Sequence, residues 1–364
     1  MNISTICVHG CDKRYDTTGA ISVPIFASST FAHPGVGQST GFDYSRSLNP
    51  TCEYLEHTVA ALEGGSHGIA FSSGMAAISV LMELFSPGDH IVASDDLYGG
   101  SYRLFSQISQ KNGLKFSYAN TAEEISKLIT PATKAIFLET PTNPMMRITN
   151  IADVAEVKRK HNLLLIVDNT FLTPYLQRPL ELGADIVLHS GTKYLGGHND
   201  TLAGLLVTSD SALNEKLRFI AKTIGACLSP FDSFLIIRGI KTLAIRMERQ
   251  QESARTIAKW LGEQSEVTAV HYPGLGGMIS FSVKSEQVAV KVLEGVKVIK
   301  YAESLGGTES LITYPTLQTH ADIPESERIA RGIDARLLRL SVGLEDAGDL
   351  IEDLKAAMST AIFF

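Results

Sequence analysis

Short runs of β-branched and apolar residues alternate with helical stretches through the first part of the chain. These runs predict strands at 68–71, 91–93, 115–118, 135–138, 163–167 and 185–188. Helical patterns separate several of them, at 101–111, 122–129 and 151–161. Because helical crossovers join parallel strands and cover both faces of a sheet, the alternation predicts an α/β fold with a mostly parallel sheet.

The chain is too long for a single hydrophobic core, and its 364 residues predict about two domains. Residues 1–50 are rich in Ser, Thr, Gly and Pro without a sustained period, which predicts an extended N-terminal arm rather than a folded core. We expect a large domain over 51–229 and a smaller α+β C-terminal domain over 230–364. The smaller domain has a predicted long helix at 233–264, strands near 267–272, 279–283 and 337–342, and helices near 286–294 and 347–359.

Composition excludes several classes of partner. The formal net charge is −7 and Lys and Arg are scattered, so no basic stripe can neutralise a nucleic-acid backbone. No apolar run reaches the roughly 18–20 residues that span a bilayer, and MNISTICVHG lacks the pattern of a leader, so we expect a cytoplasmic protein without a membrane segment. Four cysteines are too few for a disulfide scaffold. Cys7, His9 and Cys11 lie close together, but no second cluster completes a zinc shell, and we expect no metal.

Polar residues follow several of the predicted strands. In open α/β sheets, ligands gather at the carboxyl ends of the strands. Such segments occur, in order, as SSGM at 72–75, ETPTNP at 139–144, VDNT at 167–170 and HSGTK at 189–193. We therefore expect one cleft to hold them all.

The first and last of these segments predict a phosphate site. Gly74 and Met75 offer backbone N–H groups at a helix N-terminus, and Ser190 and Thr192 offer hydroxyl groups. Neither a P-loop lysine pattern nor GxGxxG accompanies them, which favours a small phosphorylated cofactor over a nucleotide. Taken alone, a Ser-Ser-Gly sequence before a helix is more often a plain N-cap.

Lys193 and Asp168 carry the chemistry in this hypothesis. A desolvated lysine near another cation can form an imine with an aldehyde. Asp168 ends the apolar run LLLIVD, where its carboxylate needs a cationic partner such as a protonated pyridine nitrogen. Taken singly, Lys193 is more often a solvated surface lysine and Asp168 a helix cap. Together with the phosphate site, they predict pyridoxal 5′-phosphate held as a Schiff base on Lys193.

A serine hydrolase is the competing interpretation. The sequence AFSSG around Ser72 differs from the G-x-S-x-G elbow only at its first position. Asp168 with His189 or His320 could complete a triad. This interpretation leaves Lys193 without a role, and we disfavour it.

Longer motifs resemble one enzyme family along the whole chain. They are DYSRSLNPT at 43–51, SSGMAA at 72–77, LYGG at 97–100, ETPTNP at 139–144, VDNTF at 167–171, HSGTKYLGGH at 189–198, ESLGGTES at 303–310 and LLRLSVGLE at 337–345. The chain thereby resembles the Cys/Met-metabolism branch of fold-type I pyridoxal-phosphate enzymes. The resemblance implies the PLP-dependent transferase fold type I, with a mostly parallel large domain, a smaller α+β domain and an extended N-terminal arm.

The resemblance also implies a role for each matching residue. Lys193 and Tyr98 would be catalytic, Lys193 as the Schiff-base lysine and Tyr98 stacked on the cofactor ring. Asp168 would pair with the pyridine nitrogen. The cofactor phosphate would be held by Gly74, Met75, Ser190 and Thr192.

Substrate contacts and a shared site follow from the same resemblance. The substrate carboxylate would be gripped by Arg339 with Asn143 and Ser304, and Glu303 would also contact substrate. Taken alone, an Arg between two leucines is more often in a surface ion pair. Tyr44 and Arg46 would reach the phosphate of a neighbouring subunit, in a homotetramer built from dimers that share active sites.

The resemblance extends to the reaction. Residues 308–324 look like those of bacterial cystathionine γ-synthase and O-acetylhomoserine thiolyase, which favours γ-replacement on an O-acylhomoserine with cysteine to give cystathionine. The alternative is a cystathionine γ- or β-lyase, which eliminates a thiol, ammonia and a 2-oxo acid. Gly100 stands where methionine γ-lyases usually have Cys, which disfavours that activity. A cofactor-binding protein without turnover is a further alternative.

Three departures from the family pattern stand out. Leu48 occupies a position where Gly is common, and Gly191 one where Ala is common. The connection at 273–277 is shorter than in relatives.

Overall fold

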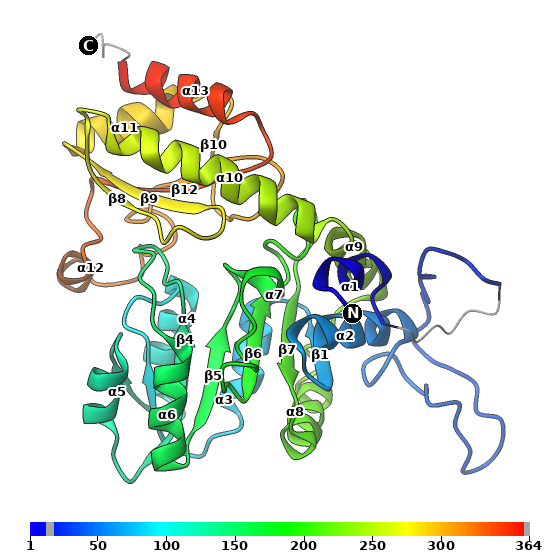
Figure 1. Ribbon diagram of the computed structural model, residues 1–364. Coiled ribbons are helices and arrows are strands. Elements are labelled where there is room, and N and C mark those ends of the chain that lie inside the picture. The colour runs from blue at the N-terminus through cyan, green and yellow to red at the C-terminus, as the bar shows by residue number, and fades with distance from the viewer. Residues whose placement is uncertain (12–17, 360–364) are drawn as a thin grey trace.

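The computed structural model describes residues 1–11 and 18–359, which contain two sheets with helices packed on them (Figure 1). The larger sheet has seven strands in the order β1-β7-β6-β5-β4-β2-β3. Their bounds are β1 (His67–Phe71), β2 (His90–Ala93), β3 (Lys115–Tyr118), β4 (Thr133–Glu139), β5 (Leu164–Asp168), β6 (Ile186–Ser190) and β7 (Gly204–Thr208). The strands from β3 to β6 in this order run parallel, which confirms the mostly parallel sheet.

β7 is the strand that the alternation of elements did not predict. All five of its residues are buried, and it lies antiparallel to both β6 and β1. No α-helix lies in the connection 191–203 between β6 and β7, and two strands joined without a helical crossover pair antiparallel. Lys193 lies in this connection, so the segment that carries it is anchored at both ends by two strands that pair with each other.

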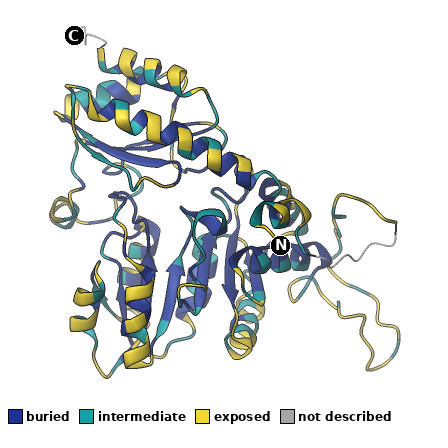
Figure 2. Ribbon diagram, viewed as in Figure 1, coloured by how far each residue is buried: buried dark blue, intermediate teal, exposed yellow. Residues whose placement is uncertain are grey.

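Helices cover both faces of the larger sheet. One face packs against α2 (Pro50–Glu63), α6 (Ile151–His161) and α9 (Pro230–Ile240), and the other against α3 (Gly74–Met82), the π-helix η1 (Leu104–Ser109) and α8 (Ser211–Ile224). The ends of α2 show how the sequence sets these helices: Asn49 caps the first turn, and Gly64 ends the helix in the left-handed conformation. Figure 2 shows the buried strands between the partly exposed helices.

The smaller domain is built on a five-stranded sheet in the order β10-β11-β12-β9-β8. Its strands are β8 (Val267–His271), β9 (Met278–Val283), β10 (Lys300–Tyr301), β11 (Leu311–Thr313) and β12 (Leu337–Ser341). Leu338 and Leu340 of β12 pack in one core with α10 (Leu243–Gly262), α11 (Glu286–Gly295) and α13 (Ala347–Ser359). Because side chains alternate along a strand, Arg339 projects from the opposite face, where it contacts the large domain at Asn143.

The prediction of one continuous helix over 233–264 is wrong. The chain instead forms α9 and α10, with a break at Thr242, whose backbone leaves the helical conformation (φ −110°, ψ 7°). Arg246 donates to the carbonyl oxygen of Gly239 at 2.8 Å across this break. Gly239 also packs so closely on the loop before β7 that a Cβ there would lie 2.1 Å from the Gly196 carbonyl oxygen.

The N-terminal arm is extended except at its beginning. α1 (Ile3–His9) starts at Asn2, whose side chain accepts a hydrogen bond from Ser4 N–H, and it packs Cys7 against the large core. This helix corrects the expectation that the arm lacks folded structure. The segment 18–49 is irregular and extends away from the body of the molecule, largely exposed (Figures 1 and 2).

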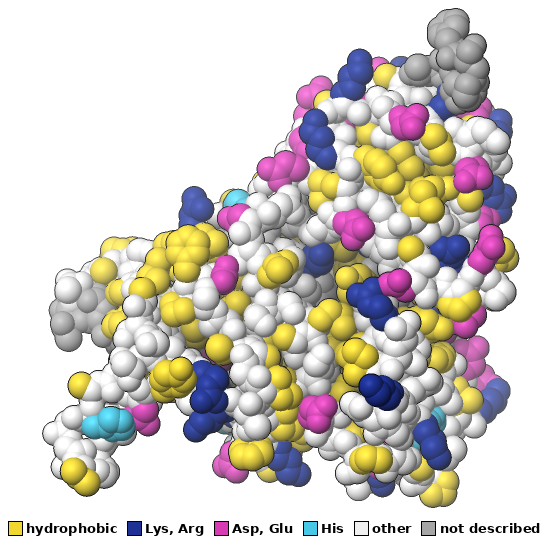
Figure 3. All heavy atoms as spheres, turned by 180° about the vertical axis from the view of Figure 1, so that it is seen from behind, with side chains coloured by type: hydrophobic (Ala, Val, Ile, Leu, Met, Phe, Trp, Pro, Cys, Tyr) yellow, Lys and Arg dark blue, Asp and Glu magenta, His cyan; other side chains and the backbone are white. Residues whose placement is uncertain are grey.

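Four short helices complete the described structure: α4 (Gly99–Arg103), α5 (Ala122–Leu128), α7 (Thr173–Leu176) and α12 (Glu325–Arg331). On the face shown in Figure 3, Lys and Arg side chains are scattered among acidic and apolar ones. Within residues 1–11 and 18–359, no helix has both the length and the apolarity to cross a membrane.

Candidate active site

A pocket of about 260 Å³ lies at the carboxyl ends of the central strands, between the two sheets. It is lined by most of the predicted site residues: Gly74, Met75, Tyr98, Asn143, Asp168, Ser190, Thr192, Lys193, Glu303, Ser304 and Arg339. A more open cavity of about 770 Å³ adjoins it and shares Thr192, Glu303 and Ser304. The structure therefore brings these residues together, while the role of each stays a prediction.

Lys193 follows β6 and points into the pocket. Its Nζ donates a hydrogen bond to Ser304 Oγ at 2.9 Å. Burial, and then the positive charge of Arg339, lower the pKa of Lys193 to about 8, against an opposing effect of Glu303. The amine is therefore neutral far more often than an exposed lysine would be, and a neutral amine is the form that attacks an aldehyde.

Asp168 and Glu139 place two carboxyl groups at one end of the pocket. They lie opposite each other in the parallel register of β4 and β5. Burial raises the pKa of both groups, and the charge of Asp168 raises that of Glu139 further. Asp168 Oδ1 accepts hydrogen bonds from the N–H and the hydroxyl of Thr170, at 3.0 and 2.5 Å. Among the described residues Asp168 has no ion-pair partner, so the pocket favours a ligand that brings a cation to it.

The N-terminus of α3 and the loop after β6 form the candidate phosphate site. Ser73 caps α3 by accepting from Ala76 N–H, and helix geometry leaves the N–H groups of Gly74 and Met75 without intrahelical acceptors. A Cβ at Gly74 would lie 3.1 Å from the Ser190 Cβ, so glycine keeps this corner open. Thr192 also lines the pocket, although its hydroxyl already contacts the backbone of Ala203.

Tyr98 forms one wall of the pocket. It precedes α4 directly, and its N–H donates to Glu139 Oε2 at 2.9 Å. A Cβ at Gly100 would lie 2.5 Å from Cε1 of the Tyr98 ring, so this ring position requires the glycine. Tyr98 is 40% exposed and lines the pocket, so its ring could stack on a planar ligand.

Arg339 is a buried cation at the opposite wall, and it is 1% exposed. Its Nη1 donates to Asn143 Oδ1 at 2.9 Å, and its Nη2 donates to Ser304 O at 3.0 Å and to Thr313 Oγ1 at 3.1 Å. Burial lowers the pKa of Arg339 to about 10, so the group stays charged at neutral pH. These partners are neutral, and a buried cation held by neutral partners fits an anionic ligand such as a carboxylate. The surface ion pair that a lone Arg usually forms is thereby contradicted.

Tyr44 and Arg46 are the predicted site residues that do not line this pocket. They lie in the exposed arm, with the Arg46 guanidinium 5.4 Å from the centre of the Tyr44 ring. Arg46 Nη1 donates to the carbonyl oxygen of Lys222 on α8 at 2.6 Å. Their predicted contact with a neighbouring subunit's phosphate stays a prediction.

The serine-hydrolase interpretation is wrong on geometry. His189 Nε2 contacts Glu63 Oε1 at 2.6 Å, and both side chains are fully buried. His320 Nε2 lies 3.0 Å from the Asn143 carbonyl oxygen and 3.3 Å from that of Leu97. Neither histidine therefore contacts Ser72 as a base.

Two side chains that shape this site had no predicted role. Glu139 is the first residue of the ETPTNP segment. Its contact with Tyr98 joins residues far apart in the chain, which a local motif does not reveal. Thr170 orients Asp168 and accepts a hydrogen bond from Ser190 N–H at 2.9 Å, which ties two strand ends together. A hydroxyl two residues after a buried Asp was the available signal for Thr170.

Comparison with known proteins decides the family. The chain matches the sequence profile described as Cys/Met metabolism PLP-dependent enzyme over residues 4–359. The chain belongs to this family. Cystathionine γ-synthase of Haemophilus influenzae is 53% identical over 360 residues, covering 98% of each protein. A cystathionine γ-synthase/O-acetylhomoserine (thiol)-lyase of Bacillus subtilis is 55% identical over 349 residues, covering 95% of this chain and 94% of that protein.

Solved structures show the same fold. Cystathionine γ-lyase from Lactobacillus plantarum, complexed with L-serine, superposes with a TM-score of 0.96 at 44% identity and covers 99% of both chains. Cystathionine γ-synthase from Xanthomonas oryzae pv. oryzae superposes with a TM-score of 0.94 at 39% identity, covering 99% of this chain and 98% of that one. The chain is therefore a pyridoxal-phosphate-dependent enzyme with the fold-type I architecture.

The pocket fits the cofactor of this family at three points. Lys193 has the lowered pKa that attack on the cofactor aldehyde requires. Within the part of the chain that the structure describes, Asp168 has no ion-pair partner, and a protonated ring nitrogen would supply one. Gly74 and Met75 line the pocket at the N-terminus of α3, where N–H groups without intrahelical acceptors could bind a phosphate.

Proposed function

We propose that this enzyme catalyses γ-replacement on an O-acylhomoserine, with cysteine as the incoming thiol, to give cystathionine. The observation that carries the proposal is the pocket that joins a half-buried Lys193 of lowered pKa to a buried Arg339 cation. An α-amino acid could present its amine to one group and its carboxylate to the other. The two relatives at 53% and 55% identity, both with cystathionine γ-synthase in their names, support this reaction.

In this proposal, residues of the large domain hold the cofactor. Lys193 would bind it covalently, Asp168 would pair with its ring nitrogen and Tyr98 would stack on its ring. The phosphate is bound by Gly74, Met75, Ser190 and Thr192. When bound, pyridoxal phosphate supplies an electron sink for negative charge that develops at the substrate carbons.

The remaining residues bind and deprotonate the substrate. Arg339 and Asn143 hold the carboxylate, and Ser304 and Glu303 line the substrate side of the pocket. The Lys193 amine would be the base that moves protons at the substrate Cα and Cβ. Ser304 Oγ, which lies 2.9 Å from Lys193 Nζ, keeps that amine directed toward the reacting carbons.

A cystathionine γ- or β-lyase is the second candidate. Cystathionine γ-lyase of Bacillus subtilis is 48% identical over 376 residues, and cystathionine β-lyase of Coxiella burnetii is 46% identical over 378 residues. Elimination needs the same lysine base and carboxylate site as replacement. Methionine γ-lyase stays disfavoured because of Gly100, and a silent cofactor-binding protein is disfavoured by the complete set of pocket residues.

One assay separates these candidates. The enzyme is given O-acetylhomoserine with and without cysteine and, separately, cystathionine; cystathionine, 2-oxobutyrate and pyruvate are measured. A synthase forms cystathionine when cysteine is present. A lyase forms a 2-oxo acid from cystathionine and little cystathionine from the ester. Absence of product from every amino-acid thioether and ester would indicate a protein without turnover.

We also infer the setting in which the enzyme works. The arm residues Tyr44 and Arg46 support a homotetramer built from dimers with shared active sites, because they lie outside their own chain's pocket. The few cysteines support a reducing, cytoplasmic location. The two sheets support a division into an arm over 1–50, a large domain over 51–229 and a C-terminal domain over 230–364.

A further inference from the structure

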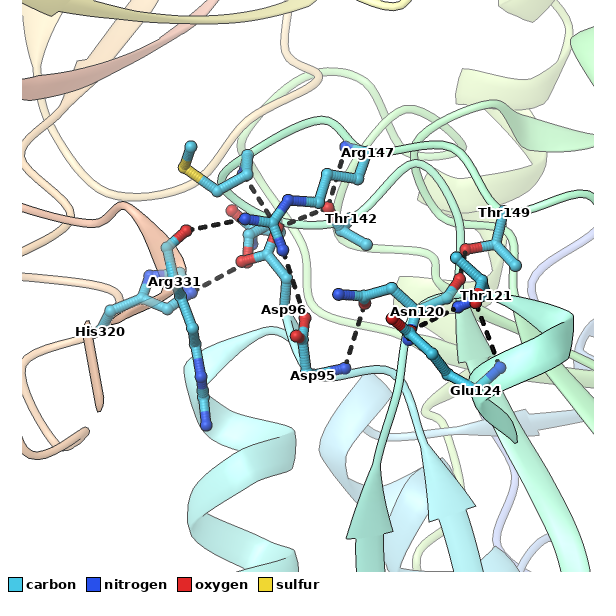
Figure 4. Close-up of polar contacts among 12 residues, drawn as sticks. Asp95, Asp96, Asn120, Thr121, Glu124, Thr142, Arg147, Thr149, His320 and Arg331 are labelled. Atoms are coloured by element: carbon cyan, nitrogen blue, oxygen red, sulfur yellow. Dashed lines mark hydrogen bonds and ion pairs between the residues drawn. The ribbon is translucent and has the colours of Figure 1, made fainter. Parts of the chain in front are cut away.

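Asp96 is a buried carboxylate to which the proposed reaction gives no role. It lies in the loop after β2, two residues before Tyr98, and is 1% exposed. Its Oδ2 accepts hydrogen bonds from Thr142 Oγ1 and from Met145 N–H, the latter at 3.1 Å. Its backbone carbonyl accepts from Asn143 N–H at 3.4 Å. Asp96 therefore contacts the loop that carries Asn143 at three points. Figure 4 shows Asp96 beside Thr142 of this loop.

The loop that Asp96 contacts carries Asn143, and Asn143 contacts Arg339. Asn143 Oδ1 accepts from Arg339 Nη1 at 2.9 Å. On its other side, His320 Nε2 lies within hydrogen-bond distance of the carbonyl oxygens of Asn143 and Leu97. Both partners are acceptors, so Nε2 carries the proton and donates. Asn143 is thus fixed through its N–H, its carbonyl group and its side chain.

Charge explains why an aspartate suits this position. A carboxylate accepts from a hydroxyl and an N–H at once, and such charge-assisted bonds are stronger than neutral ones. Burial raises the pKa of Asp96 to about 6, while the bonds from Thr142 and Met145 and the charge of Arg147 lower it. The second carboxylate oxygen, Oδ1, is buried without a partner among the described residues. Keeping the Asp96 carboxylate buried in this way costs desolvation free energy, as expected for a residue that fixes the position of the loop.

We propose that Asp96 is a positioning residue for the substrate carboxylate. Asp96 fixes the position of Asn143. Asn143 in turn fixes the position of the Arg339 guanidinium, which binds the substrate carboxylate. This inference deepens the proposed function and rests on it, because it assumes that Arg339 binds a carboxylate. It predicts that loss of Asp96 weakens binding of the carboxylate rather than of the amine.

The test compares two ligands that differ only in the carboxylate. Glycine and glycinamide both carry an amine that can react with the bound cofactor, and neither has a γ-substituent to lose. Their dissociation constants are measured with the holoenzyme from the change in cofactor absorbance, which does not depend on turnover. The wild-type enzyme should prefer glycine by about tenfold or more.

Asp96→Ala should lower the ratio of the glycinamide to the glycine dissociation constant by about tenfold. The dissociation constant of glycinamide itself should change little. Asp96→Asn keeps one acceptor oxygen and should lower the ratio less. Asp89→Asn is the matched control, because Asp89 lies at the other end of β2 and accepts from Ser86 N–H at 2.8 Å instead of contacting the Asn143 loop. This control should keep the wild-type preference.

Thr142→Val removes the hydroxyl that donates to Asp96 and tests the same contact from the other side. If Asp96→Ala does not fold with cofactor, a narrowed preference in Thr142→Val supports the proposal. An unchanged preference in the folded variants overturns the role of Asp96 and leaves the proposed function intact. Equal binding of glycine and glycinamide by the wild type would instead overturn the carboxylate site, and this inference with it.

Discussion

Glu139 and Asp168 end neighbouring parallel strands in direct register, so two carboxyl groups line one pocket side by side. Their environments differ. Asp168 accepts two hydrogen bonds from Thr170, which favour its charged form, whereas Glu139 accepts one from Tyr98 N–H. The proximity and the burial raise the pKa of Glu139 well above its ordinary range. We therefore expect Asp168 to be the member of the pair that carries the charge, as the proposed contact with the ring nitrogen requires.

Glu139→Gln should therefore lower kcat/KM only slightly, whereas Glu139→Ala should lower it strongly. Glutamine is neutral and keeps an oxygen that can accept from Tyr98 N–H, whereas alanine leaves that N–H without its acceptor, at a cost of about 1–3 kcal/mol. The measurement is kcat/KM together with the absorbance of the bound cofactor, which reports its ring environment. A glutamine variant as impaired as the alanine variant would show that Glu139 acts as an anion.

Arg339→Ala should weaken substrate binding more than it slows turnover. The lost charge-assisted contact corresponds to about 1.5–3 kcal/mol, or roughly a 10- to 150-fold rise in KM. Arg339→Lys keeps the charge without the fork and should give an intermediate KM. Arg336→Ala, which removes an exposed arginine paired with Asp334, is the control on a neighbouring residue. Wild-type saturation behaviour in Arg339→Ala would exclude the carboxylate role.

The pH dependence of cofactor capture reports the amine of Lys193. Because its pKa is lowered to about 8, the reactive neutral amine becomes more abundant as pH rises toward 8 and then levels off above it. The rate at which apoprotein takes up pyridoxal phosphate should follow this curve. Removing the Arg339 charge should move the midpoint upward, and Glu303→Gln should move it downward. A rate that still climbs steeply at pH 10 would contradict the lowered pKa.

The order of elements and most of the site follow from the sequence because their signals are local. Each of these signals lies at the end of a strand: the candidate phosphate site, Asp168 and Lys193. Strand ends converge in an α/β sheet, so these residues come together. The parallel sheet could be predicted for the same reason. The short strand β7 could not, since GLLVT carries no sign of its antiparallel pairing.

The position of Arg339 shows where local reasoning stops. Between two leucines it looked like a surface residue, yet Leu338 and Leu340 face the core of the smaller domain and turn Arg339 into the pocket. Which face of a strand meets another domain depends on tertiary packing. The contacts of Asp96 with Thr142 and of His320 with Asn143 likewise join residues separated by 46 and 177 positions.

Subunit mixing tests the arm. Lys193→Ala and Arg46→Ala should each be inactive or weak alone, and mixing them under conditions of subunit exchange should restore activity if Arg46 serves a neighbour's site. The heterodimer then contains one site with both residues intact. Lys193→Ala mixed with the double variant Lys193→Ala/Arg46→Ala is the control and should stay inactive. No recovery in the first mixture, with exchange shown by mass spectrometry, would count against the shared site.

The covalent link between cofactor and protein is the central claim. The holoenzyme is reduced with borohydride, digested, and mapped by mass spectrometry for the peptide that carries the pyridoxyl group. The modification should lie on Lys193 and be absent from Lys193→Ala. A pyridoxyl group on another lysine, or on none, would contradict the account.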